Sequence, residues 1–238
     1  MRRPHDTWAE VYDLAYEEEF GAFYEQLTQL TLKEIGKIAN PPSSIIDFGA
    51  GTGRLSLPLA RRGYQITAVE PSAPMLQRLR GAAVDVDIAC IEARMQDFRS
   101  DQKFDLAVCV FTVITYLLDE TDLRRAIMSA QNCLKPRGLL LLDVPSSKVF
   151  VSRNLQTDRI IRNVRIQPES GDLFNYSEEI VLIEAGCTDT LFADQFMIRA
   201  WPTDQVLGLA RDCGFTLVRD LSDRFASSGS NYYLLSKQ

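Results

Sequence analysis

A doubly wound α/β fold with a mostly parallel sheet is predicted by three features of the sequence. Short apolar segments alternate with helix-length segments between residues 41 and 145, and this alternation is typical of a parallel sheet covered by helices on both faces. A glycine-rich turn directly follows the first apolar segment. Residues 146–201 abandon the alternation for longer strands of mixed character, which predicts an antiparallel β insertion.

The composition is that of an ordinary globular domain. Hydrophobic residues make up 46% and charged residues 24% of the 238 residues, which excludes disordered and fibrous classes. The net charge of −6 argues against nucleic acid or an anionic membrane as the partner. The longest apolar stretch, residues 106–118, is shorter than the roughly 20 residues that span a bilayer. With no repeat or long linker, we expect a single domain over residues 1–238.

The five cysteines, Cys90, Cys109, Cys133, Cys187 and Cys213, form no metal or redox motif, because no two of them lie within four residues of each other. We interpret most of them as small buried hydrophobic residues. No secretory signal opens the sequence. These observations predict a cytoplasmic protein without a metal, present as a monomer or a homodimer.

The elements up to residue 145 follow from local patterns. Residues 7–39 place apolar side chains at helical spacing and predict one or two helices. The expected strands are 44–48, 65–69, 87–91, 104–111 and 138–144. The expected helices between them are 53–62, 73–82 and 121–134.

The remaining elements divide into an insertion and a C-terminal part. Three strands are expected at 159–166, 174–183 and 191–201, joined by turn-like segments at 168–172 and 185–189. A helix at 203–213 and a hairpin of strands 215–221 and 232–235 follow. The expected organisation is an N-terminal helical segment (1–40), an α/β core (41–145), an antiparallel insertion (146–201) and a C-terminal helix and hairpin (202–238).

The most informative segment is the turn Asp47-Phe48-Gly49-Ala50-Gly51-Thr52-Gly53. Glycines permit positive φ and let a ligand touch the backbone, because no Cβ intervenes. A helix begins directly afterwards, and its free N–H groups attract anionic groups. Glu70 ends the next strand, where doubly wound folds place an acid that accepts the ribose hydroxyls of a nucleoside.

Two nucleoside ligands compete for this turn. The spacing is G-x-G-x-G rather than the dinucleotide fingerprint G-x-G-x-x-G. Asp47 would also repel a pyrophosphate, whereas it attracts an ammonium group such as that of S-adenosylmethionine. The residues therefore favour S-adenosylmethionine over a dinucleotide, and a turn that binds nothing is the third interpretation.

Several segments together resemble the class I S-adenosylmethionine-dependent methyltransferases. They are 47–53 as the first motif, 68–72 with Met75 as the second, 92–98 as the adenine-contacting third, 104–111 as the fourth strand and 134–139 as the turn into the fifth. The resemblance implies a Rossmann-like, seven-stranded sheet with its last strand antiparallel. One departure is Arg94, where relatives often carry Asp for the adenine amino group; Gln96 or a backbone carbonyl then takes that role.

The N-terminal segment 8–16 resembles the cofactor lid of family members that methylate small molecules. The resemblance makes residues 1–40 a lid and 41–145 the cofactor-binding core, and we expect the insertion 146–201 to cap the acceptor side. Tyr12 and Tyr16 share a helical face there, either as a phenolic lid over the cofactor or as packing on the core. The cofactor contacts that the resemblance implies are Tyr12, Tyr16, Asp47, Gly49, Ala50, Gly51, Gly53, Glu70, Pro71, Met75, Arg94, Met95, Gln96 and Phe111.

Residues 111–116 follow the fourth strand, where such folds border the transferred methyl group. The Asn/Asp-Pro-Pro-aromatic pattern of nucleic-acid amino methyltransferases is absent from this segment, so we expect a small-molecule acceptor. Thr112, Tyr116 and Asp143 are its expected contacts. Tyr116 is the candidate catalytic residue that orients the acceptor, with a core aromatic residue as the alternative.

The chemical type of the methylated atom can be inferred from how few basic side chains could deprotonate it. His5 is the single histidine, and its terminal position predicts a solvent-exposed bystander. Without a strong base, N-methylation is favoured over O-methylation, because a neutral amine needs no deprotonation. The alternatives are an S-adenosylmethionine-binding protein without catalysis and, less favoured, a nicotinamide-dependent oxidoreductase.

Two arginines in the insertion lie on predominantly apolar strand faces, Arg162 beside Ile160 and Val164, and Arg199 beside Met197. Such an arginine needs a partner, either a carboxylate such as Glu179 or an anionic group of the ligand. The ion pair is the more frequent case. The ligand hypothesis makes Arg162 and Arg199 contacts of an acceptor that carries a carboxylate or phosphate.

Overall fold

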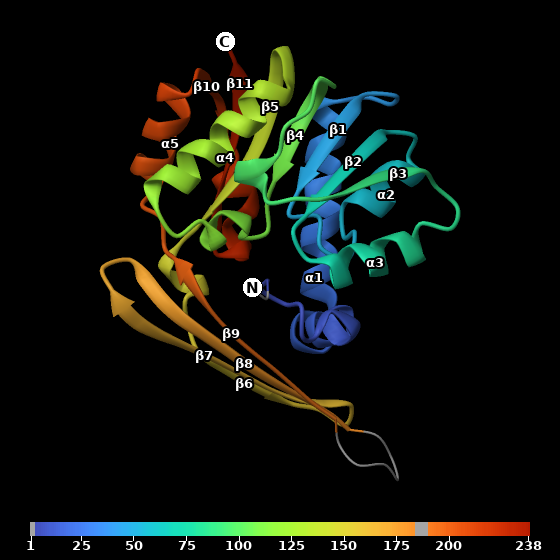
Figure 1. The fold of residues 1–238 in the computed structure, drawn as a ribbon, viewed down its shortest axis with the longest axis vertical. Coiled ribbons are helices and arrows are strands. Elements are labelled where there is room, and N and C mark those ends of the chain that lie inside the picture. Colours follow the sequence, from blue (N-terminus) through green and yellow to red (C-terminus); the bar gives the residue numbers. More distant parts are fainter. Residues whose placement is uncertain (1–2, 184–189) are drawn as a thin grey trace.

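The computed structural model describes residues 3–183 and 190–238, so Cys187 and the turn expected at 185–189 lie outside the described residues. A seven-stranded sheet forms the core, in the order β10-β11-β5-β4-β1-β2-β3 (Figure 1). Its strands are β1 (Ser44–Phe48), β2 (Gln65–Glu70), β3 (Ile88–Glu92), β4 (Phe104–Cys109), β5 (Leu134–Pro145), β10 (Phe215–Asp220) and β11 (Ser230–Lys237). Only β11 runs antiparallel to its neighbours among them. The predicted fold class is confirmed.

Helices cover both faces of this sheet. They are α1 (Tyr12–Ile38), α2 (Ser56–Arg61), α3 (Ala73–Ala82), α4 (Glu120–Cys133) and α5 (Thr203–Asp212). Helices α4 and α5 bury their apolar sides on one face, while the second half of α1, with α2, packs on the other. Short 3-10 turns are η1 (Ala9–Val11), η2 (Met95–Asp97), η3 (Val113–Tyr116), η4 (Ser147–Val149) and η5 (Ser222–Ser228). No helix within the described residues is long and apolar enough to cross a membrane.

The insertion is a separate antiparallel sheet that projects from the core (Figure 1). Its four strands are β6 (Arg153–Gln156), β7 (Ile160–Ser170), β8 (Leu173–Leu182) and β9 (Thr190–Arg199). The sequence predicts three of these strands and misses β6, whose Arg-Asn-Leu-Gln sequence carries little strand propensity. Pairing with β7 forms β6 nevertheless.

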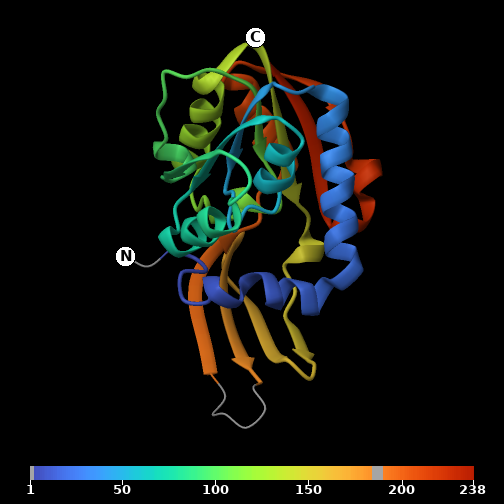
Figure 2. The same cartoon turned by 90° about the vertical axis from the view of Figure 1, so that its right-hand side faces the viewer.

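The first half of α1 lies between the core and the insertion sheet, and the second half runs along the core (Figure 2). Gly21 breaks the helix with φ of 47°, a conformation that only glycine adopts at low cost. Ala15 of α1 packs against Ile160 of β7 and Ile180 of β8 in one buried cluster. The bend therefore turns one helix into a lid over the carboxyl edge of the sheet.

Candidate active site

A cavity of about 570 Å³ lies at the junction of the lid, the core and the insertion sheet. Aromatic side chains make up much of its wall: Tyr12, Tyr16, Phe20, Phe23, Tyr24, Phe111, Tyr116, Phe150, Tyr176, Phe196 and Tyr232. Its charged lining residues are Arg54, Asp143, Lys148 and Arg153. A cavity with apolar walls and few polar groups is the usual form of a small-molecule site.

The glycines of the turn between β1 and α2 differ in their surroundings: two are tightly packed and one is open to a ligand. Its three glycines, Gly49, Gly51 and Gly53, have φ of 72°, 56° and 98°. A Cβ on Gly49 would lie 2.4 Å from Val113, and one on Gly53 would lie 2.3 Å from Leu79. A Cβ on Gly51 would meet nothing within 4 Å, so the backbone is accessible there, as a ligand contact requires.

Two buried carboxylates flank this turn. Asp47 accepts a hydrogen bond of 2.6 Å from the Ser56 hydroxyl, and burial raises the pKa of Asp47 to about 6. Glu70 accepts from the backbone N–H of Gly51 at 3.0 Å and of Ser72 at 2.9 Å. Burial, opposed by these hydrogen bonds, raises the pKa of Glu70 to about 7. A cationic or hydroxyl-bearing ligand would stabilise both carboxylates.

The other predicted cofactor contacts lie around the same edge. Ala50 is buried in the turn itself, and its N–H donates to the Val69 carbonyl at 3.3 Å. Pro71 follows Glu70 and is partly exposed, while Met75, in the first turn of α3, is buried.

In the third segment, Met95 and Gln96 are buried, and the Gln96 side-chain amide donates to Asp122 at 3.0 Å. Arg94 points instead into an exposed ion pair with Asp97. This geometry gives Arg94 a surface partner, and the Gln96 amide is already engaged within the protein.

The N-terminal lid is anchored to the glycine turn and forms an aromatic stack. Asp13 accepts a hydrogen bond of 2.6 Å from the Thr52 hydroxyl. Trp8 stacks on Tyr12 with ring centroids 5.2 Å apart, and Tyr12 stacks on Tyr16 at 4.5 Å. Within the described residues, three polar atoms of this lid are buried without a hydrogen-bond partner: His5 Nδ1, Asp6 Oδ1 and Trp8 Nε1. Buried polar atoms without a partner are rare in proteins, and of these three residues only His5 lines the cavity.

The segment after β4 has an unusual backbone. Phe111 and Thr112 both have positive φ, 64° and 70°, although neither is glycine, and this conformation costs about 1–3 kcal/mol per residue. Asp143 at the end of β5 accepts from the Thr112 N–H at 3.2 Å and holds the turn. Burial raises the pKa of Asp143 to about 7. The predicted residues Phe111, Thr112, Tyr116 and Asp143 all line the cavity.

His5 corrects an expectation. It is no exposed bystander, because its Nε2 atom lies 2.7 Å from the Tyr116 hydroxyl and its ring lines the cavity. Its backbone N–H donates to Asp194 on β9 at 2.8 Å. Burial, with the nearby charge of Arg162, lowers the pKa of His5 to about 3, so the imidazole is neutral at physiological pH. The sequence carries no local signal for this contact.

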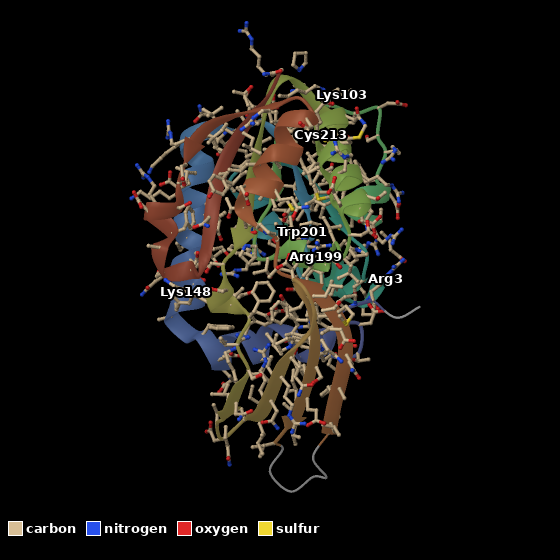
Figure 3. All side chains as sticks on the ribbon, turned by 90° about the vertical axis from the view of Figure 1, so that its left-hand side faces the viewer. Arg3, Lys103, Lys148, Arg199, Trp201 and Cys213 are labelled. Atoms are coloured by element: carbon tan, nitrogen blue, oxygen red, sulfur yellow. The ribbon has the colours of Figure 1, made fainter. Side chains whose placement is uncertain are left out.

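The two insertion arginines have partners within the protein. Arg162 donates to Glu178 at 2.6 Å and also to Glu19. The predicted partner Glu179 is wrong, because it is exposed on the opposite face of β8. Arg199 donates to the Leu118 carbonyl at 3.0 Å and lies 4.1 Å from the centre of the Trp201 ring (Figure 3). Neither arginine lines the cavity.

Arg54 is a cavity residue that the sequence interpretation missed. It directly follows Gly53, and its guanidinium lies between two rings, 3.6 Å from the centre of Tyr24 and 3.7 Å from that of Phe111. It donates to the Thr28 hydroxyl at 2.7 Å and the Tyr24 carbonyl at 2.8 Å. Its place immediately after the glycine turn was the signal in the sequence that could have identified it.

Sequence comparisons connect this architecture with known proteins. A family model described as a methyltransferase domain matches residues 45–138. A putative methyltransferase of Geobacillus sp. is 30% identical over 145 residues, which are 60% of this chain and 58% of that protein. The putative methyltransferase YqeM of Bacillus subtilis is 27% identical over 92% of this chain and 89% of its own length.

Solved structures share the fold over the full length. DesVI of Streptomyces venezuelae superposes with a TM-score of 0.82 at 20% identity, covering 100% of both chains. The sugar N-methyltransferase KedS8 from Streptoalloteichus sp. superposes with a TM-score of 0.74 at 21% identity, covering 100% of this chain and 97% of its own. The insertion and the lid are therefore parts of the shared architecture.

Proposed function

The chain belongs to the class I S-adenosylmethionine-dependent methyltransferases, and from this premise we propose that it methylates a nitrogen atom of a small-molecule acceptor. The observation that carries the proposal is the aromatic cavity of about 570 Å³ between the lid, the segment after β4 and the insertion sheet. It is a partly open space of small-molecule size with mainly aromatic walls, and it is not a groove lined by a row of basic residues.

The residues around the glycine turn fit S-adenosylmethionine. The open backbone at Gly51 and the buried carboxylates Asp47 and Glu70 suit the ammonium group and the ribose hydroxyls of this ligand. When bound, S-adenosylmethionine supplies a methyl group that the positive sulfur has already activated. The stacked rings of Tyr12 and Tyr16 offer π faces to a cation and keep water out.

The chain's own task is to present an uncharged acceptor nitrogen in line with the methyl group. Desolvation in the cavity lowers the pKa of an amine, so the acceptor binds as the neutral amine after its proton has passed to bulk water. The positive charges of Arg54 and Lys148 add to that effect. His5, with its pKa lowered to about 3 by burial, is too weak a base to deprotonate a hydroxyl group.

A second candidate, O-methylation, is favoured by one observation. Asp143 lines the cavity, and burial raises its pKa to about 7, near the value that suits a general base at neutral pH. The carboxylate of Asp143 already accepts a hydrogen bond from the Thr112 N–H, which leaves less of it available to accept a proton from a hydroxyl group. The name of the similar structure KedS8, a sugar N-methyltransferase, lends support to nitrogen.

The test begins with cofactor binding and proceeds to acceptors. Calorimetry should detect S-adenosylhomocysteine, and a thermal-shift comparison should show stabilisation by this ligand and none by NADH. Matched pairs of small amines and alcohols are then incubated with S-adenosylmethionine and analysed by mass spectrometry. Methylation of an amine, with its alcohol analogue untouched, supports the proposal. Methylation confined to alcohols, or tight cofactor binding without any product, contradicts it.

A further inference from the structure

Two arginines near the cavity have opposite electrostatic surroundings. Arg162 is 1% exposed and contacts two carboxylates, Glu178 and Glu19. Burial alone would lower the pKa of Arg162, but the Glu178 carboxylate raises it above the ordinary value. Arg54 hydrogen-bonds only to the neutral oxygens of Thr28 and Tyr24, with no ion pair to any described carboxylate. Arg54 is therefore a half-buried cation that forms no ion pair with the described carboxylates.

The position of Arg54 leaves one edge of its guanidinium available. The Nε and Nη2 atoms donate to protein oxygens, and Nη1 has no partner within the described residues. The rings of Tyr24 and Phe111 hold the guanidinium plane between them. Since both aromatic residues and Arg54 line the cavity, the free edge is held in a fixed plane at the cavity wall.

The other charged groups of the cavity do not neutralise Arg54. Lys148, on η4, is an exposed residue at the rim and forms no ion pair with the described residues (Figure 3). Arg153 is already paired with Glu19 at 2.5 Å. Asp143 is the one carboxylate among the described lining residues, and backbone N–H groups hold it. In a chain of net charge −6, the cavity thus carries an excess of positive charge.

We propose that Arg54 is the centre of an anion-binding subsite, assisted by Lys148 at the rim, for a carboxylate or phosphate group of the methyl acceptor. This proposal rests on the proposed function, since it names the substrate class of the same site. It also moves anion recognition from Arg162 and Arg199 in the insertion to a core residue. The acceptor then combines an apolar or aromatic body, an amine and an anionic group.

A carboxylate at Arg54 has two sources, the acceptor or the methionyl part of the cofactor. The acceptor is favoured because the same cavity reaches Lys148 and the insertion residues Tyr176 and Ile198, whereas Gly51 and Glu70 do not line it. A bidentate contact from a guanidinium to a carboxylate or phosphate is among the strongest neutralising contacts in proteins. The experiment must therefore measure both ligands separately.

The experiment compares benzoate with its neutral analogue benzamide by ligand-observed NMR, and S-adenosylhomocysteine by calorimetry. The proteins are the unaltered chain, Arg54→Met and the control Lys33→Met, which removes one positive charge from an exposed position on α1. We expect benzoate to bind the unaltered chain at least about tenfold more tightly than benzamide, as for a charge-assisted contact. Arg54→Met should abolish this preference, and Lys33→Met should retain it. The affinity for S-adenosylhomocysteine should stay within about twofold in both variants.

Three results would overturn the inference. Equal binding of benzoate and benzamide to the unaltered chain does so without any variant, and thus independently of whether Arg54→Met folds. A benzoate preference that persists in folded Arg54→Met does so as well. Loss of S-adenosylhomocysteine binding in Arg54→Met with an unchanged benzoate preference assigns Arg54 to the cofactor instead. A chain that binds the benzoate probe but no S-adenosylhomocysteine contradicts the proposed function and leaves the anion subsite intact.

Discussion

The Nε2 atom of His5 and the hydroxyl oxygen of Tyr116 lie 2.7 Å apart at the wall of the cavity. The partners are 111 residues apart in the sequence, His5 in the N-terminal part of the lid and Tyr116 in the turn η3 after β4. Burial raises the pKa of Tyr116 well above its usual value, so the phenol keeps its proton. A neutral imidazole and a neutral phenol thus form a fixed polar group in an otherwise aromatic wall.

Tyr116→Phe should lower kcat/KM for the acceptor by about tenfold, because we propose that the Tyr116 hydroxyl orients the acceptor by a hydrogen bond. S-adenosylhomocysteine affinity, measured by calorimetry, should stay unchanged. Tyr64→Phe is the matched control. The Tyr64 hydroxyl donates to the Ala39 carbonyl at 2.7 Å, in the apolar cluster beneath the second half of α1 and away from the cavity lining. Equal kcat/KM for the two variants would assign Tyr116 a packing role only. Because burial lowers the pKa of His5 to about 3, no imidazole titration should appear in the rate between pH 5 and 8.

The core could be predicted from the sequence because its signals are local. The strand Ser44–Phe48, the glycine turn and Glu70 follow one another within a short segment, and each has a distinctive residue pattern. The kink at Gly21 and the pairing of β6 depend on contacts with the insertion sheet, which no local pattern describes. Strand alternation placed Arg162 on the correct face of β7.

The candidate site was less predictable because it depends on register and on distant contacts. Glu178 and Glu179 lie on opposite faces of β8, and the partner of Arg162 is the one on the face that packs toward the lid. The sequence does not show which face that is, whereas the structure shows that it carries Glu178. His5 is positioned by hydrogen bonds to Asp194 and Tyr116, both more than 100 residues away. A single polar residue near a terminus shows no periodicity, and its burial depends on tertiary contacts alone.

Gly51→Val and Glu70→Ala should each abolish measurable S-adenosylmethionine binding. The valine fills the open space beside the backbone and strains a position with φ of 56°, and the alanine removes the carboxylate that we propose to bind the ribose hydroxyls. Calorimetry on the folded variants measures both effects. Gly81→Val on α3 is the matched control, because a Cβ there also meets nothing within 4 Å but lies away from the turn. Retained binding in Gly51→Val would place the ligand elsewhere.

The buried Arg162 on β7 should be a structural residue, because it pairs with Glu178 on the neighbouring strand β8 and with Glu19 on the lid helix α1. Glu178→Ala leaves the Arg162 charge with one carboxylate fewer, and removing one partner of a buried pair costs about 3–5 kcal/mol. Chemical denaturation should therefore show a large loss of stability, whereas the exposed Glu179→Ala should change stability by less than about 0.5 kcal/mol. Arg162→Met should also destabilise the fold without changing the KM for the acceptor. An acceptor KM raised tenfold in a folded Arg162→Met would restore this arginine as a ligand contact.

Asp143→Asn should alter the pH dependence of stability in a defined direction. Burial raises the pKa of Asp143 from 3.8 to about 7, so between these values the folded chain holds a proton that the unfolded chain has lost. The folded state then binds more protons than the unfolded state, and the free energy of unfolding falls as pH rises from about 4 to about 7. Asparagine cannot titrate, so this part of the decline should disappear from urea unfolding series at pH 4.5, 5.5 and 6.5 (about the middle of that window). Burial also raises the pKa values of Asp47 and Glu70. Their contribution to the fall of stability with pH should therefore remain in the variant. An identical slope in both proteins would mean that Asp143 is ionised in the empty cavity, and it would then be a poor candidate for a base that is tuned to neutral pH.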